Sequence, residues 1–123
     1  MSHRPTVLVH LCPSDEWASA RPEGELRPES LANVGFVHLS TPAQAHLPAN
    51  RLFRGRDDLV LLHIDPDRLQ APIRWEPEVS TDPESMVFPH LYGALPVVAV
   101  IRVTPYLPGA DGVFAPAGAS AGE

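Results

Sequence analysis

The run Asp58-Leu59-Val60-Leu61-Leu62-His63-Ile64 constrains the fold more than any other segment of the chain. Aliphatic residues fill five of its seven positions, and Asp65-Pro66 follows as a turn signal. An apolar, partly β-branched run of this length that stops at a turn is typical of a β-strand. We therefore predict a strand over 58–64, followed by a turn with a short helical segment over 65–69.

Other segments share this character with weaker patterns. Apolar and β-branched residues predict further strands over 6–11, 34–40, 73–76 and 97–103, the first and the last of them buried. Stretches that contain proline and polar residues predict loops over 21–30 and 77–85, and an irregular connector over 88–93. The pattern over 51–56 fits a short strand or a helical turn equally well.

A helix is predicted to start directly after the first strand. Pro13 suits the first turn of a helix, where its missing N–H costs no hydrogen bond. Asp15 and Glu16 would then lie near the positive end of the helix dipole. Trp17 would anchor this helix to the sheet.

A second helix start is predicted at Thr41, directly after the strand over 34–40. Thr41 can act as the N-cap, Pro42 fits the first helical position, and Gln44 completes a capping box. Pro48 is expected to end or interrupt this helix early.

The order strand, helix, strand, helix and then mostly strands predicts an α+β fold rather than a wound βαβ sheet. A chain of 123 residues fits one domain and can bury a core without a disulfide or a metal. We place this domain at residues 1–115. Proline, glycine and alanine dominate the remainder, so 116–123 is predicted to be a disordered tail.

Charge and composition exclude several classes of function. The formal net charge is −6 and the nine basic residues, all arginine, are scattered, which argues against binding to nucleic acid. The apolar run near the N-terminus is too short for a signal peptide or a membrane span. The single cysteine, Cys12, favours a reducing compartment, and we expect a cytoplasmic protein that is a monomer or a homodimer.

The strand-to-helix corner Gly35-Phe36-Val37-His38-Leu39-Ser40-Thr41 is the strongest candidate for a functional surface. A helix N-terminus presents free backbone N–H groups that favour anions. Together with the imidazole of His38 and the hydroxyls of Ser40 and Thr41, they would form a pocket for a phosphate, a ribose or a carboxylate. The alternative is that Ser40 and Thr41 only cap the helix and His38 only packs.

The connector around His90 is a second candidate. Pro89 restricts the backbone before it, and Tyr92 supplies an aromatic ring on a rigid loop, an arrangement that can hold a planar ligand. The alternative is a proline-rich connector in which Tyr92 covers the core. Glu76 is a candidate acid or base, although a surface ion pair with Arg74 beside a buried tryptophan is the favoured interpretation there.

The remaining candidates are weaker. His10 and His63 lie on predicted strands, where packing is their more common role. No histidine spacing supports a metal site, and no glycine-rich phosphate loop, CxxC motif or nucleophile elbow is present. Cys12 precedes a helix N-terminus, but a buried structural cysteine is the favoured interpretation.

Five ordered motifs together resemble the small bacterial family labelled domain of unknown function 952, over residues 6–115. They are Gly35 to Thr41, Asp58 to Leu62, Ile64 to Pro66, Arg74 to Glu76, and Phe88 to Gly93. The resemblance implies an ADP-ribosyltransferase-like fold, a split β-sandwich of two small sheets with short flanking helices and NAD in the cleft. In this fold the strand with His10 would face NAD, and the strand and helix after Gly35 would flank the nicotinamide.

The resemblance implies a site that binds NAD as cofactor. No metal is expected, because no histidine spacing supports a metal site. His38, His90 and Glu76 are the expected catalytic residues, and the expected cofactor-binding residues are His10, His38, Ser40, Thr41 and Tyr92. Transferases of this fold often carry a glutamate where this chain has His90, which argues against ordinary protein mono-ADP-ribosylation. The alternative function is a non-enzymatic small-ligand-binding domain, or an enzyme of secondary metabolism that reuses the cleft.

Overall fold

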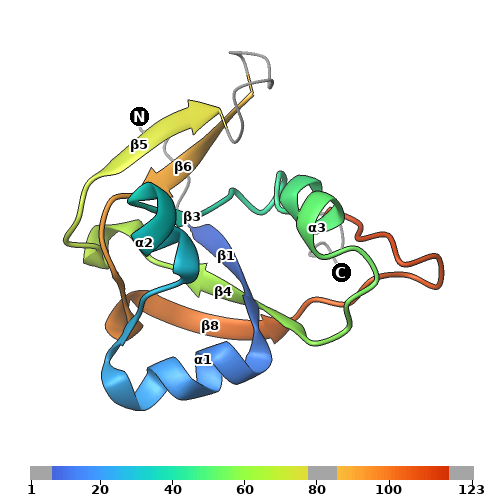
Figure 1. Ribbon diagram of the computed structural model, residues 1–123, viewed down its shortest axis with the longest axis horizontal. Helices are drawn as coiled ribbons and strands as arrows, with labels where there is room; N and C mark the ends of the chain where they lie inside the picture. Colours follow the sequence, from blue (N-terminus) through green and yellow to red (C-terminus); the bar gives the residue numbers. More distant parts are fainter. Residues whose placement is uncertain (1–6, 78–85, 117–123) are drawn as a thin grey trace.

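The fold is a mixed α/β arrangement of short helices around small antiparallel sheets (Figure 1). A computed structural model describes residues 7–77 and 86–116. Within these residues the strand orders are β1-β4-β8, β3-β6-β5 and β2-β7. The strands are β1 (Leu8–Pro13), β2 (Glu25–Leu26), β3 (Val37–His38), β4 (Leu59–Ile64), β5 (Ile73–Pro77), β6 (Val87–Leu91), β7 (Leu95–Pro96) and β8 (Val100–Pro105).

The helices are short, as predicted. They are the α-helices α1 (Ser14–Ala20), α2 (Glu29–Val34) and α3 (His46–Leu52), and the 3-10 helices η1 (Arg21–Glu23), η2 (Pro66–Arg68) and η3 (Val97–Ala99). Two small three-stranded sheets agree with the expected α+β class, whereas the two-stranded sheet of β2 and β7 was not predicted. The predicted tail lies almost wholly outside the described residues, and the loop over 77–85 does so from residue 78 onward.

Strand β4 confirms the strongest sequence prediction and is the central strand of its sheet. It pairs antiparallel with β1, with Ile64 opposite Leu8 and Leu59 opposite Pro13, and its other edge pairs with β8. Side chains of β4 alternate between two apolar clusters. Leu62 and Ile64 belong to one cluster, and Leu59 and Leu61 to the other. Because both faces are covered, the strand reads as a continuous apolar run.

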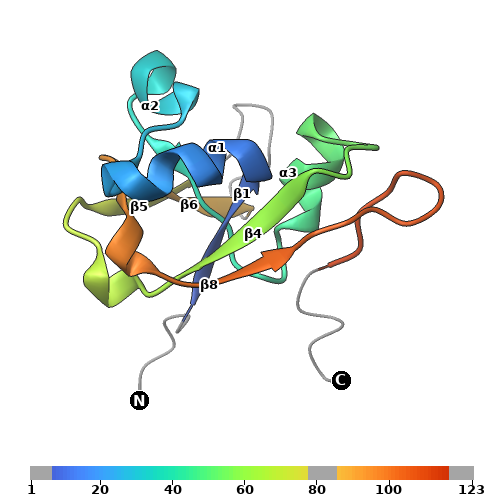
Figure 2. The same ribbon diagram turned by 90° about the horizontal axis from the view of Figure 1, so that it is seen from below.

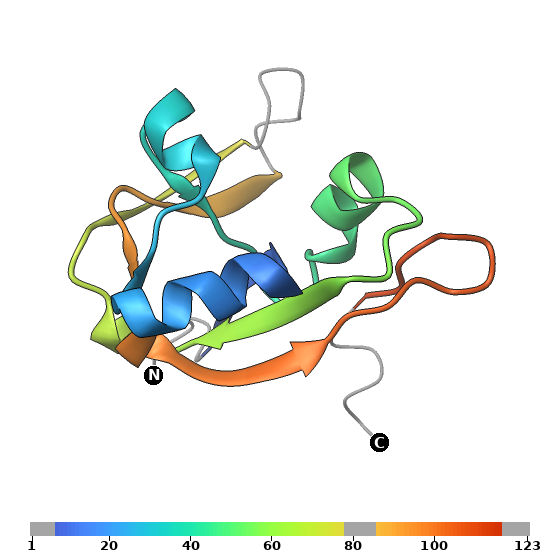
Figure 3. The same ribbon diagram turned by 60° about the horizontal axis from the view of Figure 1, so that its bottom comes forward.

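The two clusters receive different helices. The first contains Ala20 at the end of α1, with Trp17 packed against it, as predicted for this side chain. The second contains Ala45 and Ala49 of the α3 region together with Phe114. Figures 2 and 3 show α1 lying along β4, and α3 near the end where β4 begins.

Residues 37–40 join the two three-stranded sheets. Val37 and His38 pair with β6, and the N–H of Leu39 donates to the carbonyl of Pro89 over 3.0 Å. Ser40 then exchanges two backbone hydrogen bonds of 2.8 Å with Val9 of β1. One extended segment therefore pairs first with one sheet and then with the other, and the sheets separate at this point.

The predicted connector over 88–93 is wrong, because most of it forms β6, the middle strand of the second sheet. Proline normally argues against a central strand, since it has no N–H for the ladder. The carbonyl of Pro89 accepts from Leu39, so the missing donor is the one that would return to Leu39. The lost hydrogen bond thus falls where the paired segment leaves β6 for β1, and the strand tolerates it.

The second predicted helix start is also wrong. Helix α3 begins at His46 with Ala45 as its N-cap, five residues after Thr41. Half of the predicted capping box does form, because the side-chain oxygen of Gln44 accepts from the N–H of Thr41 over 3.1 Å. Pro48 lies in the first turn of α3 rather than at its end. In the first turn, the backbone N–H groups have no partner within the helix, so the missing N–H of proline costs no hydrogen bond.

The predicted loop over 21–30 is shorter than expected, since it holds η1, β2 and the start of α2. Helix α2 includes Val34, which was predicted to begin the strand over 34–40, and Gly35 is its C-cap. The φ of Gly35 is 89°, a left-handed conformation that favours glycine. Three residues of the segment, Val37, His38 and Ser40, make strand or bridge pairs.

The last strand is not buried as predicted. β8 is an edge strand whose Ile101 and Val103 side chains are 50% and 39% exposed. Apolar composition alone could not distinguish an edge from a central position, because exposure depends on whether another strand pairs beyond it. None of the helices in the described residues is both long enough and apolar enough to cross a membrane.

Candidate functional site

A row of three polar side chains crosses the second sheet. His38 of β3 is paired with His90 of β6, and His90 is paired with Arg74 of β5. Directly paired residues of antiparallel strands share a face of the sheet, so all three side chains lie together. The ring centroids of His38 and His90 are 5.4 Å apart, and the ring planes meet at 83°. The structure thus brings together the two histidines that the sequence singled out.

Two aromatic rings complete this cluster. Phe36 stacks on the imidazole of His90 with a centroid distance of 4.0 Å and an angle of 10° between the planes. The same ring lies 4.9 Å from the ring of His38 and 5.2 Å from that of Tyr92. Phe36 was missed as a site residue. The period of two along a strand, which puts Phe36, His38 and Ser40 on one face, was the available signal.

The carboxylate of Glu76 links two members of the cluster. Its Oε1 accepts from Nδ1–H of His90 over 2.8 Å and from the hydroxyl of Tyr92 over 2.7 Å. Both hydrogen bonds hold the pKa of Glu76 below its ordinary value, and the bond from Tyr92 has the larger effect. The same bond raises the pKa of Tyr92, because ionisation would remove the donated proton.

The favoured interpretation of the Arg74-Trp75-Glu76 segment is therefore corrected. Glu76 binds His90 and Tyr92, and the guanidinium carbon of Arg74 lies 5.0 Å above the Tyr92 ring as a cation–π contact. Trp75, expected to be buried, is 44% exposed because β5 is an edge strand.

His10 of β1 contacts the backbone of His38. Its Nδ1 lies 2.7 Å from the carbonyl oxygen of His38. Burial lowers the pKa of His10 to about 4, so the ring is neutral near pH 7 and donates its Nδ1 proton to that carbonyl. Strand β1 is thereby connected to the backbone of His38.

Ser40 and Thr41 do not form the expected anion pocket at a helix N-terminus. Ser40 is 4% exposed, and its backbone pairs with Val9. The N–H of Thr41 is taken by Gln44, and α3 begins only at His46. Thr41 remains partly exposed at the end of the segment that carries His38.

Exposure divides the predicted site residues into two groups. His90 is 1% exposed, Ser40 is 4% exposed and His10 is 8% exposed, so none of these three presents much surface to solvent. The partly exposed group is His38, Thr41, Glu76 and Tyr92. A ligand would meet this second group first, and it would reach His90 only after the covering side chains shift.

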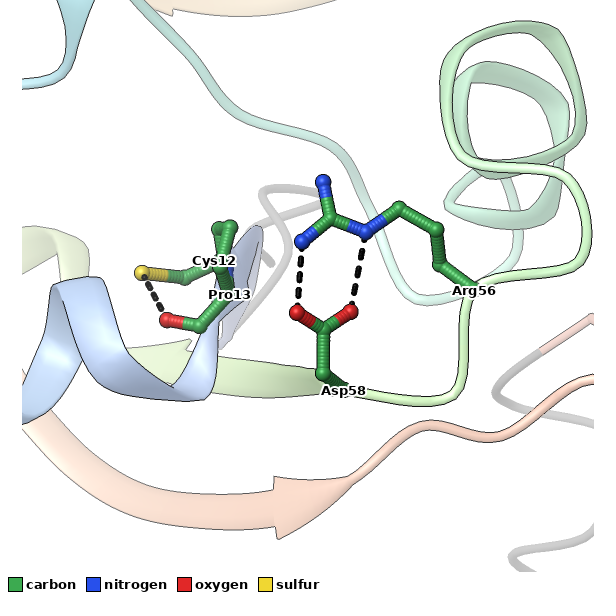
Figure 4. A network of polar contacts seen from close by, with 4 residues as sticks. All are labelled: Cys12, Pro13, Arg56 and Asp58. Atoms are coloured by element: carbon green, nitrogen blue, oxygen red, sulfur yellow. Dashed lines mark hydrogen bonds and ion pairs between the residues drawn. The ribbon is translucent and has the colours of Figure 1, made fainter.

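Cys12 lies elsewhere and is not part of this cluster. Its thiol donates to the carbonyl of Pro13 (Figure 4). The side chain is fully buried, and burial raises the pKa of the thiol to about 12. A thiol with this pKa is a poor nucleophile near neutral pH, which agrees with a structural cysteine. In Figure 4, Arg56 and Asp58 pair through two parallel contacts at the start of β4.

His63 also lies outside the cluster. Its Nε2 is 2.9 Å from the hydroxyl oxygen of Thr104 on the neighbouring strand β8. Burial, followed by the nearby charge of Arg102, lowers its pKa. Among residues 7–77 and 86–116, no three His, Cys, Asp or Glu side chains gather closely enough to hold a metal ion.

Comparison with known proteins identifies one family model and solved structures of one protein that are similar to this chain. The family model described as "Protein of unknown function (DUF952)" matches residues 11–103. The crystal structure of protein CC0527 from Caulobacter crescentus is similar at 32% identity with a TM-score of 0.76, over 89% of this chain and 94% of that one. Its solution NMR structure gives the same identity and TM-score over 96% and 99%. The curated proteins contain no match.

Proposed function

The chain belongs to the DUF952 family, and we propose that it binds NAD or a related nucleotide as an enzyme of the ADP-ribosyltransferase-like class. The observation that carries the proposal is the convergence of His38, His90, Glu76 and Tyr92 on one face of the second sheet. Imidazoles, a carboxylate and aromatic rings in one cluster are suited to proton transfer and to holding a planar ring.

The separation of the two three-stranded antiparallel sheets supports the fold part of the proposal. In an ADP-ribosyltransferase-like arrangement, the ligand lies along the strands at which the sheets separate. Here the sheets separate along residues 37–40, and His38 is the partly exposed side chain of that segment. We assign His38 and Thr41 to the ribose of the nicotinamide half, with Ser40 supporting them.

His90 is assigned to orienting or polarising the group that reacts with the nucleotide. It lies beneath Phe36 and is 1% exposed, so ligand binding must move the Phe36 ring. A planar ligand ring of similar size could then stack on the imidazole, because offset stacking suits any aromatic pair.

Calorimetric titration with NAD tests the binding. We expect saturable binding in the millimolar range or tighter, weakened at least tenfold in His38→Ala, which removes the accessible imidazole. His63→Gln is the matched control, because His63 lies on the first sheet and contacts Thr104. Absence of binding at millimolar NAD, or equal affinity in His38→Ala, would refute the proposal.

A non-enzymatic ligand-binding domain, or an enzyme of secondary metabolism using the same cleft, is the second candidate. The burial of His90 and the engagement of Glu76 by two donors favour it, because a ligand reaches His90 only after the covering side chains shift and Glu76 already accepts two hydrogen bonds. Chromatography of a mixture of protein and NAD separates the two. Release of free nicotinamide, lost in His38→Ala, supports NAD chemistry, whereas saturable binding with intact NAD supports the second candidate.

A further inference from the structure

We propose that Glu76 and Tyr92 are positioning residues that hold His90 with its proton on Nδ1, so that Nε2 accepts a hydrogen bond from the ligand. This inference rests on the proposed function. It also names the chemical class of the ligand group: an amide N–H or a hydroxyl is accepted at this nitrogen, whereas a carboxylate or a phosphate is not.

The tautomer follows from the identity of the neighbour at Nδ1. An ionised carboxylate can only accept hydrogen bonds, and Oε1 of Glu76 lies 2.8 Å from Nδ1 of His90. Nδ1 must therefore carry a proton. In the neutral ring Nε2 then holds the lone pair, as in other sites where a carboxylate orients a histidine.

Tyr92 strengthens this arrangement because its hydroxyl donates to the same oxygen of Glu76 over 2.7 Å. Two donors on one oxygen restrict the rotation of the carboxylate. The ring of Tyr92 is in turn covered by the guanidinium of Arg74 at 5.0 Å. The hydroxyl proton of Tyr92 is committed to Glu76, so Tyr92 acts on the ligand through His90 rather than as a donor.

In the ligand-free protein, Phe36 limits rotation of the imidazole itself. Its ring is stacked on that of His90 at 4.0 Å, and a flip of the imidazole would place a C–H group against the Glu76 carboxylate. That exchange would remove the Glu76 acceptor from the Nδ1–H group of a histidine that is 1% exposed, which is costly. The Phe36 ring on its face and the Glu76 carboxylate at its Nδ1 edge thus favour one orientation of the imidazole.

Nitrogen NMR of the imidazoles in the ligand-free protein tests the positioning role directly. At a pH where His90 is neutral, we expect the Nδ1–H tautomer in the wild type. Glu76→Gln should keep it, because the amide oxygen can still accept from Nδ1–H, whereas Glu76→Ala should give a mixture of tautomers. An Nε2–H tautomer in the wild type, or an unchanged tautomer in Glu76→Ala, would overturn the inference.

Nicotinamide and nicotinate test the ligand class, since they share a ring and differ in an amide donor against a carboxylate. We expect nicotinamide to bind on the order of tenfold more tightly to the wild type and to Glu76→Gln, with the preference lost in Glu76→Ala. Equal or tighter binding of nicotinate to the wild type would overturn this part. If NAD and both probes fail to bind, the proposed function and the ligand class fall together, while the NMR result still decides the positioning role.

Discussion

At the scale of single residues, His10 shows how burial determines the charge of a side chain. It lies in the apolar strand β1, and the carbonyl of His38 accepts its Nδ1 proton. Desolvation lowers its pKa from 6.5 to about 4. The unfolded chain therefore takes up a proton at higher pH than the folded chain does.

The consequence is a stability that depends on pH with a definite sign. The contribution of His10 is fully present above pH 6.5 and is lost as the pH falls toward 4, by up to roughly 3 kcal/mol. The amide of the asparagine in His10→Asn can still donate to His38. When the pH is lowered from 7.5 to 4.5, the free energy of unfolding of this variant should fall less than that of the wild type. Denaturant titrations followed by circular dichroism measure the difference. An identical pH dependence in both proteins would contradict the assignment.

Phe36 is the second residue with a separable role. Phe36→Ala removes the ring stacked on His90, so we expect faster hydrogen–deuterium exchange at the Cε1–H of His90, measured by mass spectrometry. The free energy of unfolding should fall by about 1–2 kcal/mol, since Phe36 is only partly buried. Phe53→Ala is the control, because Phe53 is partly buried against the apolar cluster that contains Ala49 and Phe114, and this change should leave His90 exchange unchanged.

At the scale of elements, the second sheet and the segment after β8 each depend on one unusual contact. Gly93 follows β6, and a Cβ there would lie 2.6 Å from the Cβ of Ala71, so any larger residue would force Ala71 or the connection to β7 to move. Asn50 of α3 makes a reciprocal pair with Phe114: its amide nitrogen donates to the carbonyl over 3.0 Å, and its oxygen accepts from the N–H over 2.8 Å.

The Asn50 pair predicts a clear mutational effect. Asn50→Ala leaves both backbone groups of Phe114, a fully buried residue, without their partners. We expect a loss of about 2–3 kcal/mol in unfolding free energy. Asn33→Ala, at an exposed position of α2, is the matched control and should change stability by less than about 0.5 kcal/mol. Similar values for the two variants would mean that the pair contributes nothing measurable.

At the scale of the whole molecule, β4 belongs to both apolar clusters and couples them. Leu62 faces the cluster with α1, and Leu61 faces the cluster with α3 and Phe114. Leu62→Ala and Leu61→Ala should each lower the unfolding free energy by about 2–5 kcal/mol, and each variant should retain a single transition. Leu52→Ala, 60% exposed, is the control. If tryptophan fluorescence and circular dichroism report unfolding midpoints at different denaturant concentrations, the two clusters unfold independently.

Local chemistry predicted part of this molecule well. The run ending at Ile64 predicted β4, Pro13 with its acidic neighbours predicted α1, and Asp65-Pro66 predicted the helical turn η2. In each case neighbours in sequence make the element. The failures share the opposite cause. β6 and the exposed β8 depend on which distant strands pair with them, and the residues before α3 make long-range bonds, Ser40 with Val9 and the Gln44 side chain with the carbonyl of Val87. No local signal carries that information.

The candidate site divides in the same way. The residue types indicate that His38, His90 and Glu76 can transfer protons, and the strand period indicates which neighbours share a face of the strand. The family resemblance follows from the same motifs. Only the tertiary structure decided that β6 lies between β3 and β5, which places Glu76 against His90 and Phe36 over its ring. Chemical capacity is a property of each side chain, whereas tautomer, burial and access are set by neighbours that are distant in the chain.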